Sequence, residues 1–597
     1  MGAIIFGRSR TFIDFHMQNF AAQSWDIAQL LLGNYLERIG ENGAVAPVGG
    51  ESTRTDESGH IAHALAVYHS MSERPSARVI DLVAGCIASQ FHFNGQDAGG
   101  CAHAALALLT MGLNLSRNDA WSRFQEETQK IIVSWLKKPL QVPPHQEAFR
   151  IVHAIVGHSL GFHADDNSDR LIEQWLNRAR TGSTGGFVDS SLCGIGGRYD
   201  GTALEQYALV REALQRNASI HTRTRRLPSI RTYMQRYLRL IPDLVRDDGA
   251  NWAFGSLQGC TGTIYTISFI VRAFDDGWID DDKRDLYAGV LRKLVQHLFM
   301  HYLDQGSASL CIRDGERDAK AEEMTAVINF DAIRQFLFWS QLAKGSKISL
   351  DAVATGALST SAKYIPFDHG AKTEHGLFIY RDALLGLSLQ LPLIGGNGDE
   401  TSNCGTFPHC PGIFDAPVNK RLSVLVPELT FGDRVTVPSF YGKNVSTSLG
   451  PRKEFQFRYE QPELITVDEV LTSNIASCKV LWSFVEGKVT AEFTYIPKRS
   501  IRLDSFRFTF AIASPHSRLT FPPMPFLGEN GLRPQILRDD FQGEWQQLVD
   551  VAEDPVYRTH DGKIAYLYVY ARLLSLQLHP GTPYCFSISF EPEVVRG

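Results

Sequence analysis

The spacing of the apolar residues changes once along this chain, near residue 350, and this change constrains the fold more than any other feature. Up to about residue 345 the spacing is helical: in the segment 24–40, Trp25, Ala28 and Leu32 share one stripe, with Ser24 placed as an N-cap. From about residue 375 onward the chain contains β-rich runs separated by turn residues. The sequence therefore predicts roughly a dozen helices followed by stacked antiparallel sheets.

The length of the chain indicates more than one domain. With 597 residues it is too long for one ordinary core, so we expect a helical domain over 1–350 and an antiparallel β-sandwich domain over 365–597. The segment 343–366, rich in Ser, Gly and Ala, is the expected linker. No strand-like run alternates with the helical segments, which argues against a βαβ fold.

Composition excludes several classes of function. The net charge of -6 gives no reason to expect a nucleic-acid partner, and no run of about 18 apolar residues indicates a membrane span. The nine cysteines have no zinc-ligand spacing, so we expect no cofactor and no metal ligand set among them. The first ten residues lack the apolar core of a signal peptide, which favours a cytoplasmic protein unless a signal has been removed.

The segment 185–214 combines features of a helix start with features of a reactive site. A glycine-rich loop leads to Arg198, Tyr199 and Asp200, and an amphipathic helix carrying Tyr207 follows. A tyrosine can act as a base and then as an acid when a nearby cation lowers its pKa from about 10. The alternative is that both tyrosines pack between helices.

The order of elements resembles the (α/α)-toroid polysaccharide lyases, in particular the heparinase II/III and alginate lyase group and related toroid proteins of uncharacterised function. The segment 185–209 is similar to the family's glycine- and aspartate-rich loop before a catalytic tyrosine. The segment 247–259 resembles a later family segment that usually reads Gly-Arg-Ser, although here Gly255 and Ser256 are adjacent. The resemblance implies an incomplete (α/α)-toroid catalytic domain followed by a β-sandwich.

The resemblance also implies a reaction, namely the cleavage of a uronic-acid-containing glycan by β-elimination. The enzyme must neutralise the substrate carboxylate and place a base near C5. Tyr199 beside Arg198 is the first candidate for the base, and Tyr207 is its rival. Where the family has an Asn or an Asn-His pair, this chain has His145 and Gln146, which could neutralise the carboxylate.

Further residues are candidates for binding an acidic oligo- or polysaccharide. They lie in polar turns, beside an aromatic platform or near the domain junction: His92, Asn94, Asp200, Trp252, Gln258 and His369. The segment 213–242 contains seven arginines and no acidic residue, which would attract an anionic polymer. Asp368, His369 and His375 give a weak signal for a structural divalent metal at the junction.

Two other functions remain open from the residues alone. A glycoside hydrolase on the same toroid would need two carboxylates on either side of the scissile bond. The carboxylates available for this are Asp56, Glu57, Asp189, Asp200 and Glu205. A glycan-binding protein without catalysis would retain the fold and lack the Asn-His pair and the arginine.

Overall fold

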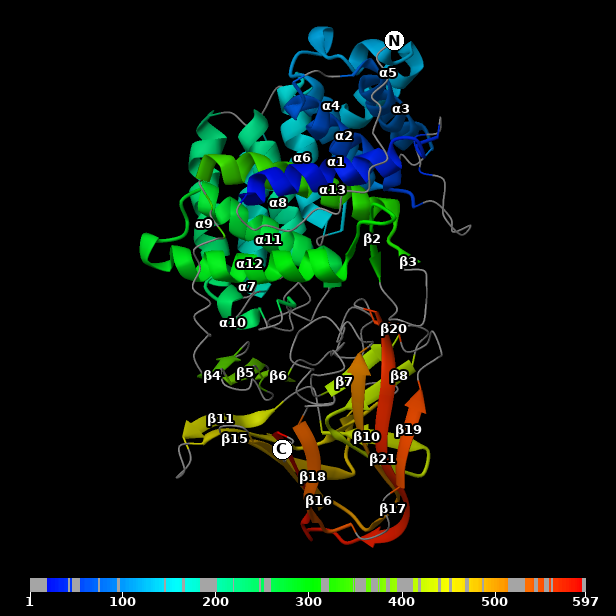
Figure 1. Ribbon diagram of the computed structural model, residues 1–597, viewed down its shortest axis with the longest axis vertical. Helices are drawn as coiled ribbons and strands as arrows, with labels where there is room; N and C mark the ends of the chain where they lie inside the picture. Colours follow the sequence, from blue (N-terminus) through cyan, green and yellow to red (C-terminus); the bar gives the residue numbers. More distant parts are fainter. Residues whose placement is uncertain are drawn as a thin grey trace.

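A computed structural model gives the fold of both halves of the chain (Figure 1). It describes residues 19–40, 43, 45, 54–73, 76–93, 97–143, 146–163, 167–182, 201–217, 220–245, 249–251, 259–312, 322–346, 348, 350, 361–366, 374, 376–382, 387–393, 412–416, 420–438, 442–449, 454–467, 472–485, 488–513, 532–541, 546–551, 558–559 and 562–592.

The helical half consists of two layers of helices. Six described helices form an inner ring in which each one contacts the next: α2 (Glu57–Met71), α4 (Ala98–Met111), α6 (Glu147–Ser159), α8 (Gly201–Asn217), α11 (Gly259–Asp275) and α13 (Ala326–Ser346). The contact of α13 with α2 closes this ring. The intervening helices pack outside it: α1 (Phe20–Tyr35), α3 (Ala77–Phe93), α5 (Glu126–Lys137), α7 (Ser168–Gly182), α9 (Ile220–Leu238) and α12 (Arg284–His301). The predicted toroid is therefore present, and its inner ring is closed.

The inner helices run parallel to one another. Gly59 of α2 lies against Gly100 of α4, and further along the same pair His63 meets His103. In the same way, Tyr265 of α11 bonds Asp331 of α13, and Ser268 bonds Gln335 one turn later. Phe149 near the start of α6 lies close to Gly99 near the start of α4. The N-terminal ends of the inner helices therefore gather at one end of the ring, which we call the mouth.

The contact between α2 and α4 leads to a first prediction. A Cβ atom on Gly59 would overlap with the backbone carbonyl of Gly100, whereas a Cβ on Gly85 of α3 would meet no atom within 4 Å. We expect Gly59→Ala to lower the free energy of unfolding by about 3 kcal/mol, because packed backbones must separate. Gly85→Ala is the control and should raise it by about 0.5–1 kcal/mol through helix propensity. Urea unfolding measures both, and equal effects would contradict the described packing.

Some details of the helical half differ from the sequence-based expectation. Ser24 is not an N-cap, because α1 begins four residues earlier with Asn19 as its cap, whose side chain accepts from the amide of Ala22. The hydroxyl of Ser24 instead donates to the carbonyl of Phe20 inside the helix, at 2.8 Å. A small sheet of three short strands also interrupts the helices: β1 (Leu303–Asp304), β2 (Ser309–Ile312) and β3 (Glu322–Glu323).

The C-terminal half is built from antiparallel sheets, as predicted. The six-stranded sheet has the order β11 (Lys443–Leu449), β12 (Phe455–Gln461), β15 (Ala476–Val485), β16 (Lys488–Pro497), β22 (Tyr584–Pro592) and β18 (Leu532–Asp539). The eight-stranded sheet contains β14 (Thr472–Ser473), β13 (Leu464–Thr466), β10 (Arg434–Val437), β9 (Pro427–Phe431), β17 (Ile501–Ala513), β21 (Gly562–Leu578) and β19 (Gln546–Val551), with β20 (Arg558–Thr559) paired to β21. Burial alternates residue by residue along β16, so one face of that strand covers the core.

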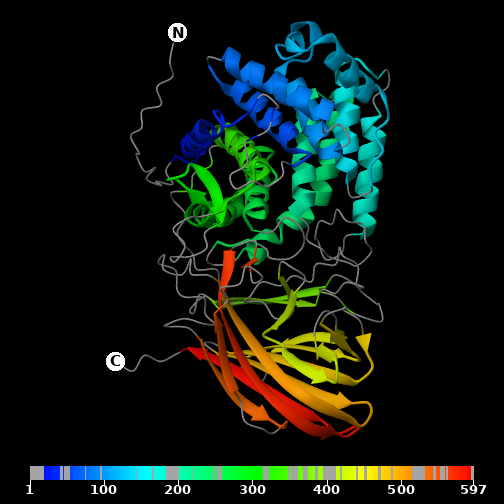
Figure 2. The ribbon, with the colours of Figure 1, turned by 90° about the vertical axis from the view of Figure 1, so that its right-hand side faces the viewer.

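Two smaller sheets complete this half. One is the pair β7 (Gly412–Ala416) and β8 (Lys420–Val424), and the other consists of β4 (Ser361–Pro366), β5 (Gly376–Asp382) and β6 (Leu387–Leu393). Along β5 the side chains alternate between two cores: Leu377 and Ile379 pack with the helical half, whereas Phe378 and Tyr380 pack with the β half. The sheet β4–β6 therefore lies between the two halves (Figures 1 and 2).

The junction between the halves lies at the mouth of the ring. The short helix α10 (Ile241–Leu244) connects the end of outer helix α9 with the loop before inner helix α11. Arg381 of β5 donates to the carbonyl of Val245 at 2.6 Å, and Gln390 of β6 donates to the carbonyl of Leu244 at 3.0 Å. These bonds hold the sheet β4–β6 against the end of the ring where the inner helices begin. None of the described helices is long and apolar enough to span a membrane.

Candidate active site

Most of the predicted site residues lie outside the described residues. They are Asn94, His145, Arg198, Tyr199, Asp200, Trp252, Gln258 and His369, together with the metal candidates Asp368 and His375. Apart from those around position 369, each of them closely precedes an inner helix in the chain: α4, α6, α8 or α11. The first residues of these helices lie together at the mouth.

Tyr207 is described, and its side chain is buried between helices. It is 1% exposed and packs against Phe269 of α11 and Trp278. Within the described part of the chain its hydroxyl has no hydrogen-bond partner, and burial raises the pKa of this hydroxyl. This is the packing arrangement that the sequence left open as the alternative. A role for Tyr207 in proton transfer stays a prediction.

His92 and Gln146 are also described. His92 is exposed at the end of α3, and its Nε2 lies 2.8 Å from the hydroxyl of Thr128 on α5. Gln146 directly precedes α6, and its side chain makes no cap bond to the helix. Its amide is therefore not committed to the helix start, as a role in binding would require.

Sequence reasoning missed a buried polar network inside the ring. It is formed by side chains from five of the inner helices: His60 and His63 of α2, His103 of α4, Glu212 of α8, Tyr265 of α11, and Asp331 and Arg334 of α13. All of them are buried. We call this set the ring network.

Asp331 is the hub of one part of the ring network. Its Oδ1 lies 2.9 Å from Nδ1 of His60 and accepts from Nη2 of Arg334 at 3.0 Å. Its Oδ2 accepts from the hydroxyl of Tyr265 at 2.5 Å. Three helices are thereby joined through one carboxylate.

Glu212 is the hub of the other part. Its Oε1 lies 2.9 Å from Nε2 of His63, and its Oε2 accepts from Nη1 of Arg334 at 3.3 Å. The Nδ1 atoms of His63 and His103 are 3.0 Å apart. His103 in turn stacks on His60, with ring centroids 3.8 Å apart. Arg334 therefore bridges the two carboxylates. The imidazoles of His60, His103 and His63 contact one another in that order and connect the same two carboxylates a second time.

The mutual contacts shift the ionisation of these groups in opposite directions. Burial opposes ionisation of Asp331, but His60 and Arg334 outweigh it and hold the pKa of the carboxyl well below its usual range. Burial lowers the pKa of His60, yet Asp331 more than compensates, so the pKa is raised. For His103, burial and the charge of His60 place the pKa well below its usual value.

The second part of the network behaves similarly. Burial lowers the pKa of His63 and outweighs the attraction of Glu212. Burial alone would raise the pKa of Glu212, but His63, Arg216 and Arg334 lower it. Glu212 is therefore a carboxylate, and His63 is neutral near pH 7.

The ionised state of Glu212 predicts an acid-dependent loss of stability. Because the folded protein lowers the pKa of Glu212, its carboxylate stabilises the fold above the unfolded-state value of about 4.3. That contribution disappears as the pH falls through 4.3 towards the folded pKa. We expect the wild type to lose unfolding free energy more steeply than Glu212→Gln between about pH 5 and pH 3. Urea unfolding across this range measures the difference, and parallel curves would contradict the assignment.

Charged groups also lie beside the ring network, near the start of α2. Arg54 donates to both carboxylate oxygens of Asp56, at 3.0 and 2.7 Å. Asp56 is 3.9 Å from Nε2 of His60. On α8, the half-buried Glu205 has its pKa raised to about 7 by burial and by the charge of Asp331. Asp56 and Glu205, two of the carboxylates that a hydrolase could use, therefore lie near the ring network.

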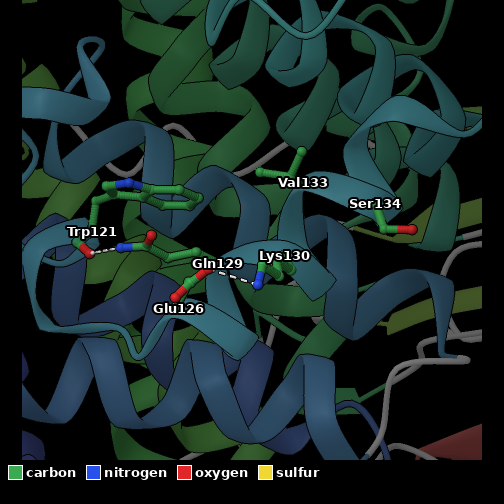
Figure 3. A pocket seen from close by; sticks show the side chains of 6 residues that line it. All are labelled: Trp121, Glu126, Gln129, Lys130, Val133 and Ser134. Carbon is green, nitrogen blue, oxygen red and sulfur yellow. Dashed lines mark hydrogen bonds and ion pairs between the residues drawn. The ribbon is translucent and has the colours of Figure 1, made fainter.

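A separate shallow pocket lies on the outer layer of helices. It has a volume of about 340 Å³ and is lined by Trp121, Glu126, Gln129, Lys130, Val133 and Ser134 (Figure 3). Lys130 pairs with Glu126 at 2.6 Å, and the amide of Gln129 donates to the carbonyl of Trp121 at 3.1 Å. It contains no predicted site residue and no member of the ring network.

Comparison with known proteins places the fold. No family model matches the chain, and no curated protein matches it. Among solved structures, a xanthan lyase from Paenibacillus is 10% identical with a TM-score of 0.51, and the match covers 97% of this chain and 57% of that chain. The chain therefore spans little more than half the length of that enzyme.

Two other solved lyases match at lower TM-scores. A chondroitin AC lyase from Streptomyces coelicolor A3 is 9% identical with a TM-score of 0.47, and the match covers 98% of this chain and 81% of that chain. A heparan sulfate lyase from Pedobacter heparinus is 10% identical with a TM-score of 0.30, with coverage of 96% and 89%. At these identities the comparison concerns the fold alone. The chain has the fold of the (α/α)-toroid polysaccharide lyases, a helical toroid followed by antiparallel sheets.

Proposed function

We propose that this protein is a polysaccharide lyase that cleaves a uronic-acid-containing glycan by β-elimination at the mouth of the toroid. The observation that supports this most strongly is the parallel direction of the inner helices. Each helix N-terminus carries a partial positive charge, and the inner helices begin at the mouth. Such an end of the ring favours an anion, and the substrate carboxylate is the anion that β-elimination must neutralise.

The position of the predicted tyrosine supports the same reaction. In the chain, Arg198 and Tyr199 are the third and second residues before α8, which is an inner helix. In the proposed reaction, Tyr199 removes the proton from C5 and returns a proton to the departing glycosidic oxygen. His145 and Gln146, next to the start of α6, bind the carboxylate.

Substrate-binding roles follow from the same placement. Asn94, Asp200, Trp252 and Gln258 precede inner helices, and we assign them to sugar contacts around the mouth. The similarity in fold to a xanthan lyase supports an acidic glycan as the class of substrate.

An absorbance assay tests the proposal. β-Elimination leaves a double bond between C4 and C5 that absorbs in the near ultraviolet, and hydrolysis leaves none. We expect incubation with alginate, glucuronan or glycosaminoglycans to raise the absorbance for at least one polymer. New reducing ends without a rise in absorbance would indicate a hydrolase instead. No change in either signal on any acidic glycan would contradict the proposal.

A further inference from the structure

Three members of the ring network form a compact group of metal-ligating side chains. His60, His103 and Asp331 each offer one ligand atom, and these atoms all lie within 4.8 Å of one another. The three residues come from α2, α4 and α13 and are at most 6% exposed. The sequence predicted no metal in the helical half, because these residues are far apart in the chain.

The hydrogen bonds of His63 determine which nitrogen of His103 is protonated. Glu212 is a carboxylate and can only accept, so Nε2 of His63 carries the proton of that bond. In neutral His63 the Nδ1 atom is then an acceptor, and the Nδ1–H of His103 donates to it at 3.0 Å. Neutral His103 is left with a lone pair on Nε2. Among the described residues this buried atom has no hydrogen-bond partner.

A buried lone pair costs free energy unless a hydrogen-bond donor or a cation interacts with it. A histidine that binds a metal through Nε2 is in the same state: its Nδ1–H donates to a neighbour, and its Nε2 carries no proton. Asp331 keeps ligand capacity, because among the described residues its Oδ2 accepts from Tyr265 alone and has a second lone pair. His60 lies directly against the ring of His103.

Carboxylates and guanidinium groups lie close together around this group. Glu205, Glu212 and Asp331 place three carboxylates in or beside the ring network. The charge of Asp331 acts on Glu205, and both act on His60. The described guanidinium between Glu212 and Asp331 is that of Arg334, and Arg216 lies at the edge, 3.4 Å from Glu212.

We propose that His60, His103 and Asp331 bind a divalent first-row transition-metal ion, with Zn²⁺ as the representative cation. Two imidazoles and one carboxylate form a ligand set that suits such ions better than it suits Mg²⁺ or Ca²⁺. Tetrahedral zinc, with bonds of about 2.0–2.2 Å, needs its ligand atoms roughly 3.4 Å apart, so the side chains must close in by small rotations.

The remaining members of the ring network would orient the ligands. His63 fixes the ring of His103, while Tyr265 and Arg334 hold the carboxylate of Asp331. With three protein ligands the ion keeps an open position. This inference does not depend on the proposed function.

Metal content after loading with ZnCl₂ and desalting tests the inference. His103→Asn is the informative variant, because its amide can replace the Nδ1–H donor to His63 while removing Nε2. His153→Gln is the matched control: His153 is a buried histidine of α6 outside the ring network, and its Nε2 bonds the carbonyl of Trp135 at 3.0 Å. Mass spectrometry of the metal and thermal unfolding with and without Zn²⁺ are the two measurements.

We expect about one zinc per chain and a higher unfolding temperature with zinc for the wild type and for His153→Gln. His103→Asn should bind zinc at least about 100-fold more weakly. If that variant does not fold, His60→Asn replaces it, because its amide can still reach Asp331. A wild type that retains no zinc and shows no thermal shift would overturn the inference. Equal zinc binding by the wild type and the ligand variant would overturn it as well.

Discussion

Replacing Arg334 by Met is expected to lower the free energy of unfolding by about 3–5 kcal/mol. Arg334 is buried and is the cation between two carboxylates, at 3.3 Å from Glu212 and 3.0 Å from Asp331. Methionine fills much of the volume but provides no charge, so two buried carboxylates lose their shared partner. The loss of one member of a buried ion pair costs far more than the pair contributes, because the remaining charge is desolvated and unpaired.

Arg123→Met is the control for this prediction. Arg123 pairs with Asp81 at 3.4 Å, and both side chains are about half exposed, so its removal should cost at most about 1 kcal/mol. Urea or thermal unfolding of the two variants beside the wild type gives the comparison. Similar small losses for both would mean that Arg334 does not neutralise the network.

Replacing Tyr199 by Phe is expected to lower kcat about 10²–10⁴-fold and to leave KM nearly unchanged. The change removes one hydroxyl and keeps the ring, so in the proposed reaction it removes the group that transfers the proton and retains the contacts that bind the glycan. The prediction depends on the proposed function, and the rate of the absorbance rise measures it.

Tyr207→Phe decides between the two tyrosines. The hydroxyl of Tyr207 is enclosed between α8 and α11, without a partner in the described part of the chain. Its removal should therefore change neither activity nor stability by much. Full activity of Tyr199→Phe together with loss of activity in Tyr207→Phe would reverse the assignment, and loss in neither would leave His145 as the candidate base.

The sequence was sufficient to predict the two halves, because periodicity reports which face of an element is buried. It could not show that the inner ring closes, because the contact of α13 with α2 joins segments about 270 residues apart. The strands β1 to β3 were also missed, since runs of two to four residues are too short to show an alternating pattern.

The site residues in the loops stay predictions, and the buried ring network could not be predicted from the sequence. The glycine-rich segment before a predicted helix indicated Arg198, Tyr199 and their neighbours as candidates. The ring network gave a fainter signal: His60 and His63 stand three residues apart among small apolar residues, as do Asp331 and Arg334. A histidine or an ion pair inside an apolar helix signals burial with a partner. The partner is unknowable from one sequence, because His60 and Asp331 are separated by 271 positions.

The masses of the products test the central claim most directly. Digestion of an acidic polysaccharide by a lyase gives oligosaccharides whose new non-reducing ends carry an unsaturated uronic acid. Each is lighter by one water molecule than the hydrolysis product of the same length. We expect mass spectrometry to detect this unsaturated series with the wild type and to find it strongly reduced with Tyr199→Phe. Products of the heavier, hydrated mass alone would contradict β-elimination at the mouth of this toroid.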